Sequence, residues 1–259
     1  MKRIGGFFGD SFYRFGSIVL FVLAWQTLCS TGLAPGTFVA SPAVIAETLA
    51  KWAVNGFLAR HGLISLSRAL YGFLLAVAVG VPLGFLLGGW FKAAGRILDP
   101  LLKFLGQFNP FALFSVFMLI FGLGETSKVA MIFWVSLWPI LHNASLGVRT
   151  VDPLFVKLAR SLGLSRPRIL WRIVVPSSAP YLFSGLRQAS GTAFFMLIPA
   201  EMLGAARGLG WLIINAQINY QIPQLYAGTA IIVAIGLAID ALFRFLEGQV
   251  VRWREKAAV

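Results

Sequence analysis

The stretch ALYGFLLAVAVGVPLGFLLGGWF, residues 69–91, contains no Asp, Glu, Lys or Arg. A helix of about 20 apolar residues is long enough to cross the hydrocarbon core of a bilayer. The same stretch carries Gly80, Gly84 and Gly88 at four-residue spacing, which allows two helix backbones to approach closely in lipid. It therefore predicts a membrane-spanning helix, placed over residues 66–90, with a glycine face that packs on a neighbouring helix.

Similar apolar runs recur along the chain. The sequence is 58% hydrophobic and only 12% charged, whereas a soluble domain is about 25% charged. Pro82 and Pro199 fall inside the apolar runs, where each is expected to kink or end its helix. The predicted fold class is an all-α integral membrane protein with about six transmembrane helices. They are expected near residues 15–34, 66–90, 103–122, 129–148, 181–200 and 225–245.

Basic residues between these runs predict the orientation of the chain. The formal net charge is +13, but a nucleic-acid partner is not expected, because such binding needs a basic face on a soluble fold. With a cytoplasmic N-terminus, 17 of the 22 Lys and Arg residues fall inside, as the positive-inside rule requires. Both termini are therefore predicted to be cytoplasmic, and the first span is expected to be retained. The predicted domains are a cytoplasmic N-terminus (1–14), a single transmembrane domain (15–248) and a basic cytoplasmic tail (249–259).

The first outside loop, residues 35–62, predicts a short helix of its own. Ser41-Pro42 is typical of a helix start. Val44, Ile45, Leu49 and Trp52 then recur at helical spacing. This pattern favours an amphipathic helix at the membrane surface.

The longest inside loop, residues 149–180, predicts two further short helices. Asp152-Pro153 is a helix start with a capping side chain, and Gly163 stands where a left-handed C-terminal cap is expected. Ser165 opens a second helix, expected to end at Pro176.

The first of these helices is amphipathic. Leu154, Leu158 and Leu162 share one face, with Phe155 and Ala159 beside them, whereas Lys157 and Arg160 point elsewhere. This apolar face must be buried, and two partners remain open on physical grounds: the bilayer surface or the groove of another protein.

The spacing Ala159-x3-Gly163-x9-Ile173-x2-Pro176 resembles the cytoplasmic "EAA" loop of ATP-binding-cassette importer permeases. Lys157 occupies the position of the usual Glu, and Leu158 follows it. FGLGETSK, residues 121–128, and the segment of residues 185–213 resemble the branch for nitrate, taurine, alkanesulfonates and bicarbonate. The resemblance extends from about residue 15 to residue 253.

This resemblance implies a type I ABC importer permease with the MetI-like fold, multi-pass in the bacterial inner membrane. It implies a second permease copy forming a homodimer, a homodimer of ABC ATPase subunits and a periplasmic substrate-binding protein. The solute would be nitrate, a sulfonate, taurine or a related small organic compound. The chain has no Gly-x4-Gly-Lys-Ser/Thr loop, so ATP and Mg are expected on the ATPase and no cofactor on this chain. The implied docking residues are Lys157, Leu158, Ala159, Arg160, Leu162, Gly163, Ile173 and Pro176.

Polar residues inside spans are candidates for the translocation path, because they are costly in lipid. Those selected are Gln107, Asn109, Asn143 and Glu201. Each also has a plain alternative, which is a hydrogen bond to a neighbouring helix or, for Glu201, a gate or interface role.

Two other classes remain as alternatives: a secondary transporter or channel, and a membrane-embedded enzyme. An enzyme needs a cluster of reactive groups, but His61 and His142 fall on opposite sides of the predicted membrane. Cys29 is the single cysteine and cannot form an intrachain disulfide. No catalytic residue and no metal site is therefore expected.

Overall fold

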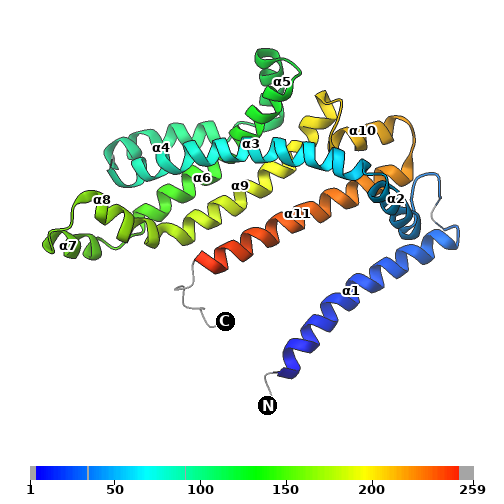
Figure 1. Ribbon diagram of the computed structural model, residues 1–259, viewed down its shortest axis with the longest axis horizontal. Coiled ribbons are helices and arrows are strands. Elements are labelled where there is room, and N and C mark those ends of the chain that lie inside the picture. The colour runs from blue at the N-terminus through cyan, green and yellow to red at the C-terminus, as the bar shows by residue number, and fades with distance from the viewer. Residues whose placement is uncertain (1–3, 34, 91, 251–259) are drawn as a thin grey trace. The chain divides into compact units, whose positions relative to one another are not determined.

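A computed structural model describes residues 4–33, 35–90 and 92–250, and within these ranges the chain is built of helices joined by short turns (Figure 1). The described part contains α-helices and two π-helical segments and no strand. The elements are α1 (Ile4–Ser30), α2 (Pro42–Val54), α3 (Phe57–Phe85), η1 (Leu86–Trp90), α4 (Lys92–Gly106), α5 (Pro110–Phe121), α6 (Glu125–Arg149), α7 (Pro153–Ser161), α8 (Arg166–Ile169), η2 (Leu170–Val174), α9 (Val175–Gly204), α10 (Leu209–Ile218) and α11 (Ile222–Val250).

The chain divides into two compact units. Unit 1 combines residues 1–62 with residues 212–232, and unit 2 combines residues 63–211 with residues 233–259. In unit 1, α2 begins as predicted, because the side chain of Ser41 accepts a hydrogen bond from the amide of Val44 at 3.4 Å. Its apolar face packs within the unit, where Ile45 lies in a buried cluster with Ala40 and Ala227.

Unit 2 is organised around α6. The predicted glycine face of α3 packs on this helix: a Cβ atom built on Gly84 would lie 2.6 Å from the Cβ atom of Ala144. A Cβ atom on Gly88 would lie 2.7 Å from the carbonyl oxygen of Ser145. Larger residues would push the helices apart at both positions, which confirms that the glycine spacing serves close packing.

Helix α9 packs against α6 in a similar manner. A Cβ atom on Gly185 of α9 would lie 2.6 Å from the Cβ atom of Asn143. On α6, a Cβ atom built on Gly147 would lie 3.0 Å from the Cβ atom of Ser178 in α9. Since α6 has close contacts to both α3 and α9, most of its length is buried, and Met131, Ile132 and Ile140 are fully covered.

Each predicted span falls on a helix, but the third is not one straight helix. In its place α4 and α5 meet at an angle of 86°, with the break at residues 107–109. Asn109 accepts a hydrogen bond from the amide of Phe111 at 2.9 Å and so starts a new helix at Pro110. The prediction of a continuous helix over residues 103–122 was therefore wrong, because an N-cap followed by proline interrupts it.

The prolines inside apolar runs affect their helices differently. Pro82 lies within α3, and a π-helical segment, η1, follows at the end of this helix. Pro199 lies within α9, which ends five residues later at Gly204. Both helices therefore pass through their proline.

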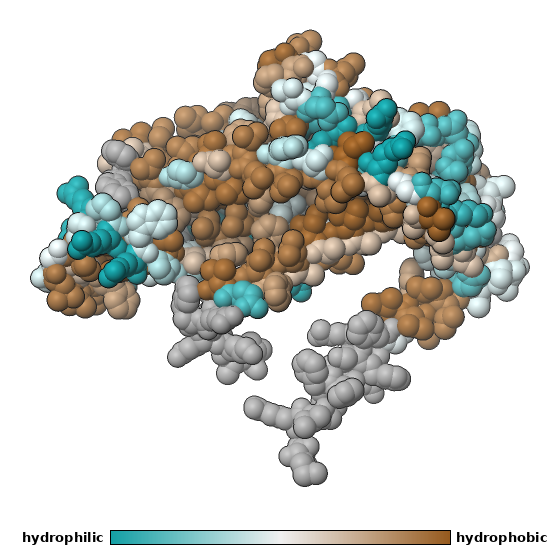
Figure 2. All heavy atoms as spheres, in the orientation of Figure 1, coloured by the Kyte–Doolittle hydropathy of each residue, from teal (hydrophilic) through white to brown (hydrophobic). Residues whose placement is uncertain are grey.

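Three helices in the described part of the chain are long and apolar enough to cross a membrane, or five when each of two bent helix pairs counts as one span. The predicted first span corresponds to α1, whose apolar portion Gly16–Ser30 is shorter than these spans. Figure 2 shows a largely hydrophobic surface over the middle of unit 2, with hydrophilic residues gathered at its α7–α8 end. This surface is that of an integral membrane protein.

Candidate functional site

The loop between α6 and α9 contains a helix with well-defined caps at both ends. At its start the carboxylate of Asp152 accepts a hydrogen bond from the amide of Leu154 at 2.8 Å. At its end Gly163 adopts a φ of 75°, and the amide of Leu164 donates to the carbonyl oxygen of Ala159 at 3.1 Å. This is the Schellman arrangement, in which a left-handed residue closes the last turn. The predicted limits of this helix, α7, are confirmed.

The apolar face of α7 is exposed. Leu154 is 68% exposed, Leu158 is 59% and Leu162 is 72%, whereas Ala159 beside them is buried. This face lines a shallow hollow of about 270 Å³ together with Ile173. So much exposed apolar surface is costly in water, and within the described residues this face of α7 stays uncovered.

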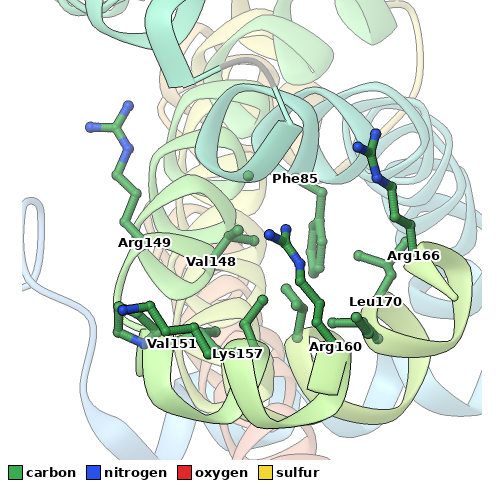
Figure 3. Close-up of a pocket in the computed structure, with 13 residues that line it drawn as sticks. Phe85, Val148, Arg149, Val151, Lys157, Arg160, Arg166 and Leu170 are labelled. Atoms are coloured by element: carbon green, nitrogen blue, oxygen red, sulfur yellow. The ribbon is translucent and has the colours of Figure 1, made fainter. Parts of the chain in front are cut away.

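The opposite face of α7 lines a larger cavity of about 500 Å³. Lys157 and Arg160 come from α7, Arg149 from the end of α6 and Arg166 from the start of α8. Figure 3 shows the guanidinium of Arg160 extending over the middle of the opening, with Arg149 and Arg166 on either side. The remaining walls are mostly apolar and include Phe85, near the end of α3.

The second predicted loop helix does not stop at Pro176. Helix α8, the π-helical segment η2 and α9 follow one another without a break from Arg166 to Gly204. Within η2 the amide of Val175 donates to the carbonyl oxygen of Leu170, five residues earlier. The expected end at Pro176 was wrong, because this wider turn accommodates the proline, which stands in the first turn of α9.

Six of the eight predicted docking residues line one of the two hollows beside α7. Lys157 and Arg160 line the larger cavity. Leu158, Ala159, Leu162 and Ile173 line the hollow on the other side. Gly163 caps α7, and Pro176 lies in the continuous helix that follows.

A second polar site lies elsewhere in unit 2, around Arg68 of α3. Its Nη1 atom lies 2.6 Å from Oε1 of Glu201, and its Nη2 atom donates to Oε1 of Glu125 at 2.6 Å. Glu201 is fully buried and accepts further hydrogen bonds from Ser65 at 2.8 Å and from the amide of Gly210 at 2.9 Å. One arginine thereby joins α3, α6 and α9.

This cluster was not predicted, although the sequence contains a signal for it. Arg68, Glu125 and Glu201 all fall at ends of predicted spans on the same, outer side of the membrane. Opposite charges at neighbouring span ends favour an ion pair. When the pair is buried, loss of either partner is strongly destabilising. What the sequence lacked was the pairing of the helices, which depends on their packing.

The four residues proposed for the translocation path lie on different elements. Gln107 is exposed at the break after α4, and Asn109 caps α5. Asn143 donates from its side chain to the carbonyl oxygen of Pro139 at 2.9 Å. Glu201 is engaged by Arg68. No hydrogen bond joins any two of these four within the described residues, and their role in a path stays a prediction.

The fold and the exposed loop define a class of protein. Helices of membrane-spanning length pack against α6, and a capped amphipathic helix with exposed leucines extends from them. This combination is that of a helical integral membrane protein with an amphipathic helix outside its spans.

Comparison with known proteins gives the family. Residues 80–252 match the family described as "Binding-protein-dependent transport system inner membrane component". The chain belongs to this family, which comprises the permeases of ABC importers, and it is therefore a transport component and not itself an enzyme.

Two curated relatives illustrate the branch. The nitrate import permease protein NrtB of Synechococcus elongatus is 32% identical, over 86% of this chain and 84% of that protein. The taurine transport system permease protein TauC of Escherichia coli is 29% identical, over 92% of this chain and 88% of that protein. This similarity confirms the predicted nitrate, sulfonate and taurine branch.

A solved structure shows the same fold. A chain from the MetNI methionine ABC transporter, in an inward-facing conformation, superposes with a TM-score of 0.63. The superposition covers 72% of this chain and 92% of that one, at 15% sequence identity. The predicted MetI-like fold is therefore confirmed.

Proposed function

We propose that this chain forms the membrane path of an importer for nitrate, taurine, another sulfonate or a related small organic compound, in the inner membrane of a bacterium. The proposal rests on the relatives NrtB and TauC, whose names state nitrate import and taurine transport. A periplasmic binding protein would deliver the solute, two copies of the chain would pair, and the first and last residues would lie in the cytoplasm.

In this proposal α7 is the contact through which ATP hydrolysis on a partner drives transport. ATP and Mg would bind to an ATPase dimer, and the apolar face of α7 would enter a groove of that ATPase. The observation that supports this role is the exposure of Leu154, Leu158 and Leu162 on a helix that is capped at both ends. An amphipathic helix in a groove is a common mode of recognition.

Two charged sites in unit 2 support the proposed orientation. Arg68, Glu125 and Glu201 meet in one cluster, and all three are outer-side residues in the predicted topology. Arg149, Lys157, Arg160 and Arg166 line one cavity, and all four are inner-side residues. Closure of an ATPase dimer would thus move α7, and α6 and α9 would transmit this movement to the other spans. This is a two-state change of the kind that ATP binding can bias.

The docking role is tested by the Leu158→Asp variant. Leu158 is 59% exposed, so the change should leave the thermal melting of the purified chain unaltered while a carboxylate enters the contact. We expect the ATPase to be lost from a detergent pull-down of the intact complex and solute uptake to fall at least tenfold.

Arg168→Asp is the matched control, since it places the same carboxylate at an exposed position that lines neither hollow. It should retain the ATPase. The Gly163→Asp substitution is less informative, because the φ of 75° at this position makes any side chain strained. Normal ATPase retention by Leu158→Asp would overturn the docking role.

The substrate class is tested separately, with the complete transporter reconstituted in liposomes and supplied with its binding protein. Uptake of nitrate, taurine and an alkanesulfonate is compared with uptake of methionine. We expect nitrate, the alkanesulfonate or the zwitterion taurine to be preferred over methionine. Preferential uptake of methionine would contradict the proposed substrate class and leave the docking role unaffected.

A further inference from the structure

The cavity between α7 and the ends of α3 and α6 lies on the face of α7 opposite to the exposed leucines on which the proposed docking rests. Four cationic residues line it, Arg149, Lys157, Arg160 and Arg166, and no acidic residue is among its described lining. Lys157, Arg160 and Arg166 form no ion pair with any described residue. At about 500 Å³, the cavity is within the range of small-molecule sites.

Arg149 is the one member of the group with an acidic neighbour. Its Nη2 atom lies 3.9 Å from Oδ1 of Asp99, a weak contact at the limit of ion pairing. Asp99 is closer to Lys103, at 2.6 Å. The positive charge around the cavity is therefore left largely without internal compensation.

The walls of the cavity show what kind of anion would fit. Phe85, Val148 and Leu170 contribute apolar surface beneath the cations. Phe85 and Val148 stand at the ends of two spans, so the cavity lies at the level where a bilayer changes from acyl chain to headgroup. A ligand with an anionic head and an apolar body matches both parts.

We infer that this cavity binds the phosphate headgroup of an anionic phospholipid from the cytoplasmic leaflet, with part of an acyl chain against the apolar wall. Basic pockets between helices on the cytoplasmic side are suited to such headgroups, because that leaflet carries the anionic lipids. Arginine binds phosphate through two parallel hydrogen bonds, and Arg160 reaches over the opening (Figure 3). The lipid would sit behind α7, on the face opposite to its exposed leucines, and hold this helix in place.

The first measurement is native mass spectrometry of the full chain in detergent, titrated with phosphatidylglycerol. We expect one tightly held phosphatidylglycerol per chain and at least tenfold weaker binding of phosphatidylcholine. The double variant Arg160→Gln, Arg166→Gln should weaken phosphatidylglycerol binding at least tenfold. The matched control, Arg168→Gln with Arg172→Gln, removes the same charge from the same loop but not from this cavity, and it should change binding less than twofold.

Several outcomes would overturn the inference. Equal losses in the two double variants would mean general attraction of anions to a basic loop. Equal binding of phosphatidylglycerol and phosphatidylcholine would show that the net charge of the headgroup does not determine binding. Displacement of phosphatidylglycerol by inorganic phosphate at equal concentration would assign the site to a soluble anion. Loss of the ATPase with lipid binding unchanged would assign these arginines to the protein partner.

A second measurement does not depend on any variant. Phosphatidylglycerol with a photoreactive group in its headgroup region is incorporated into nanodiscs with the full chain, and crosslinked peptides are identified after digestion. We expect crosslinks in residues 149–170. Crosslinks confined to the lipid-facing middle of the spans would contradict the proposed site even if the charge variants behaved as expected.

Discussion

The fold treats two groups of charged residues along α3 in opposite ways: one surrounds Arg68, in the middle part of the helix, and the other lies beside its end at Phe85. Arg68 is buried and is neutralised by Glu125 and Glu201. About 26 Å further along the helix, at 1.5 Å per residue, Phe85 lines a cavity in which no acidic residue joins Arg160 and Arg166 among the described lining. The first group uses its charge to join three helices, whereas the second leaves its charge available to a ligand outside the chain.

This difference predicts where substitutions will matter for stability. A buried charge whose partner is removed is left without compensation, while an exposed charge remains solvated. The region around Arg68 should therefore behave as part of the core, and the loop region should behave as a binding surface.

The largest effect is expected for Arg68→Met. It would leave Glu201 buried without its cation, at a cost of roughly 3–5 kcal/mol in the free energy of unfolding. Unfolding of the purified chain in a denaturing detergent series measures it. Arg160→Gln, in the second group, should change the same quantity by less than about 0.5 kcal/mol.

The double variant Arg68→Met, Glu201→Met sharpens this comparison. Removing both charges should restore a substantial part of the lost stability, because no buried charge remains. Equal stability of Arg68→Met and Arg160→Gln would show that the two groups do not differ in the way proposed.

A smaller effect is expected for Gly84→Ala, which tests whether α3 is packed tightly between the two groups. The added Cβ atom would lie 2.6 Å from the Cβ atom of Ala144 and 2.9 Å from the carbonyl oxygen of Leu141. Overpacking of this kind costs about 1–3 kcal/mol. In the control Gly191→Ala nothing lies within 4 Å, so thermal melting should be unchanged or slightly raised.

The smallest effect is expected for Asp152→Ala, in the loop region that contains α7. Loss of the cap on α7 should cost about 1 kcal/mol, felt locally in the loop and not in the spans. Hydrogen exchange in the first turn of α7 should be about fivefold faster, with global unfolding unaltered. Asp152→Asn retains a capping oxygen and should exchange at the original rate, whereas equal acceleration in both variants would rule out the cap as the cause.

Patterns that depend on local chemistry were predictable from the sequence. The limits of α7 followed from Asp152 and Gly163, because a capping side chain and a left-handed glycine act within a few residues of themselves. The glycine face of α3 followed from its spacing in the same way. The break in the third span also has a local cause, the helix start at Asn109-Pro110. This signal was present in the sequence, but the prediction of one continuous helix followed the apolar composition instead.

Contacts between distant segments were not predictable. Arg68, Glu125 and Glu201 are far apart in sequence, and nothing in their local context states that their helices meet. The continuation of the helix through Pro176 depended likewise on the wider turn of η2, which propensity alone does not indicate.

The sequence by itself determined that this protein is helical, lies in the membrane, and carries a capped amphipathic loop helix of the ABC importer permease type. These properties follow from composition and short-range spacing, which act without knowledge of the fold. Only the tertiary structure decided that Arg68 is a buried link among α3, α6 and α9, while Arg149, Lys157, Arg160 and Arg166 surround an open cavity. The physical reason is that the role of a charge depends on whether packing brings an opposite charge to it, and packing is a property of the whole chain.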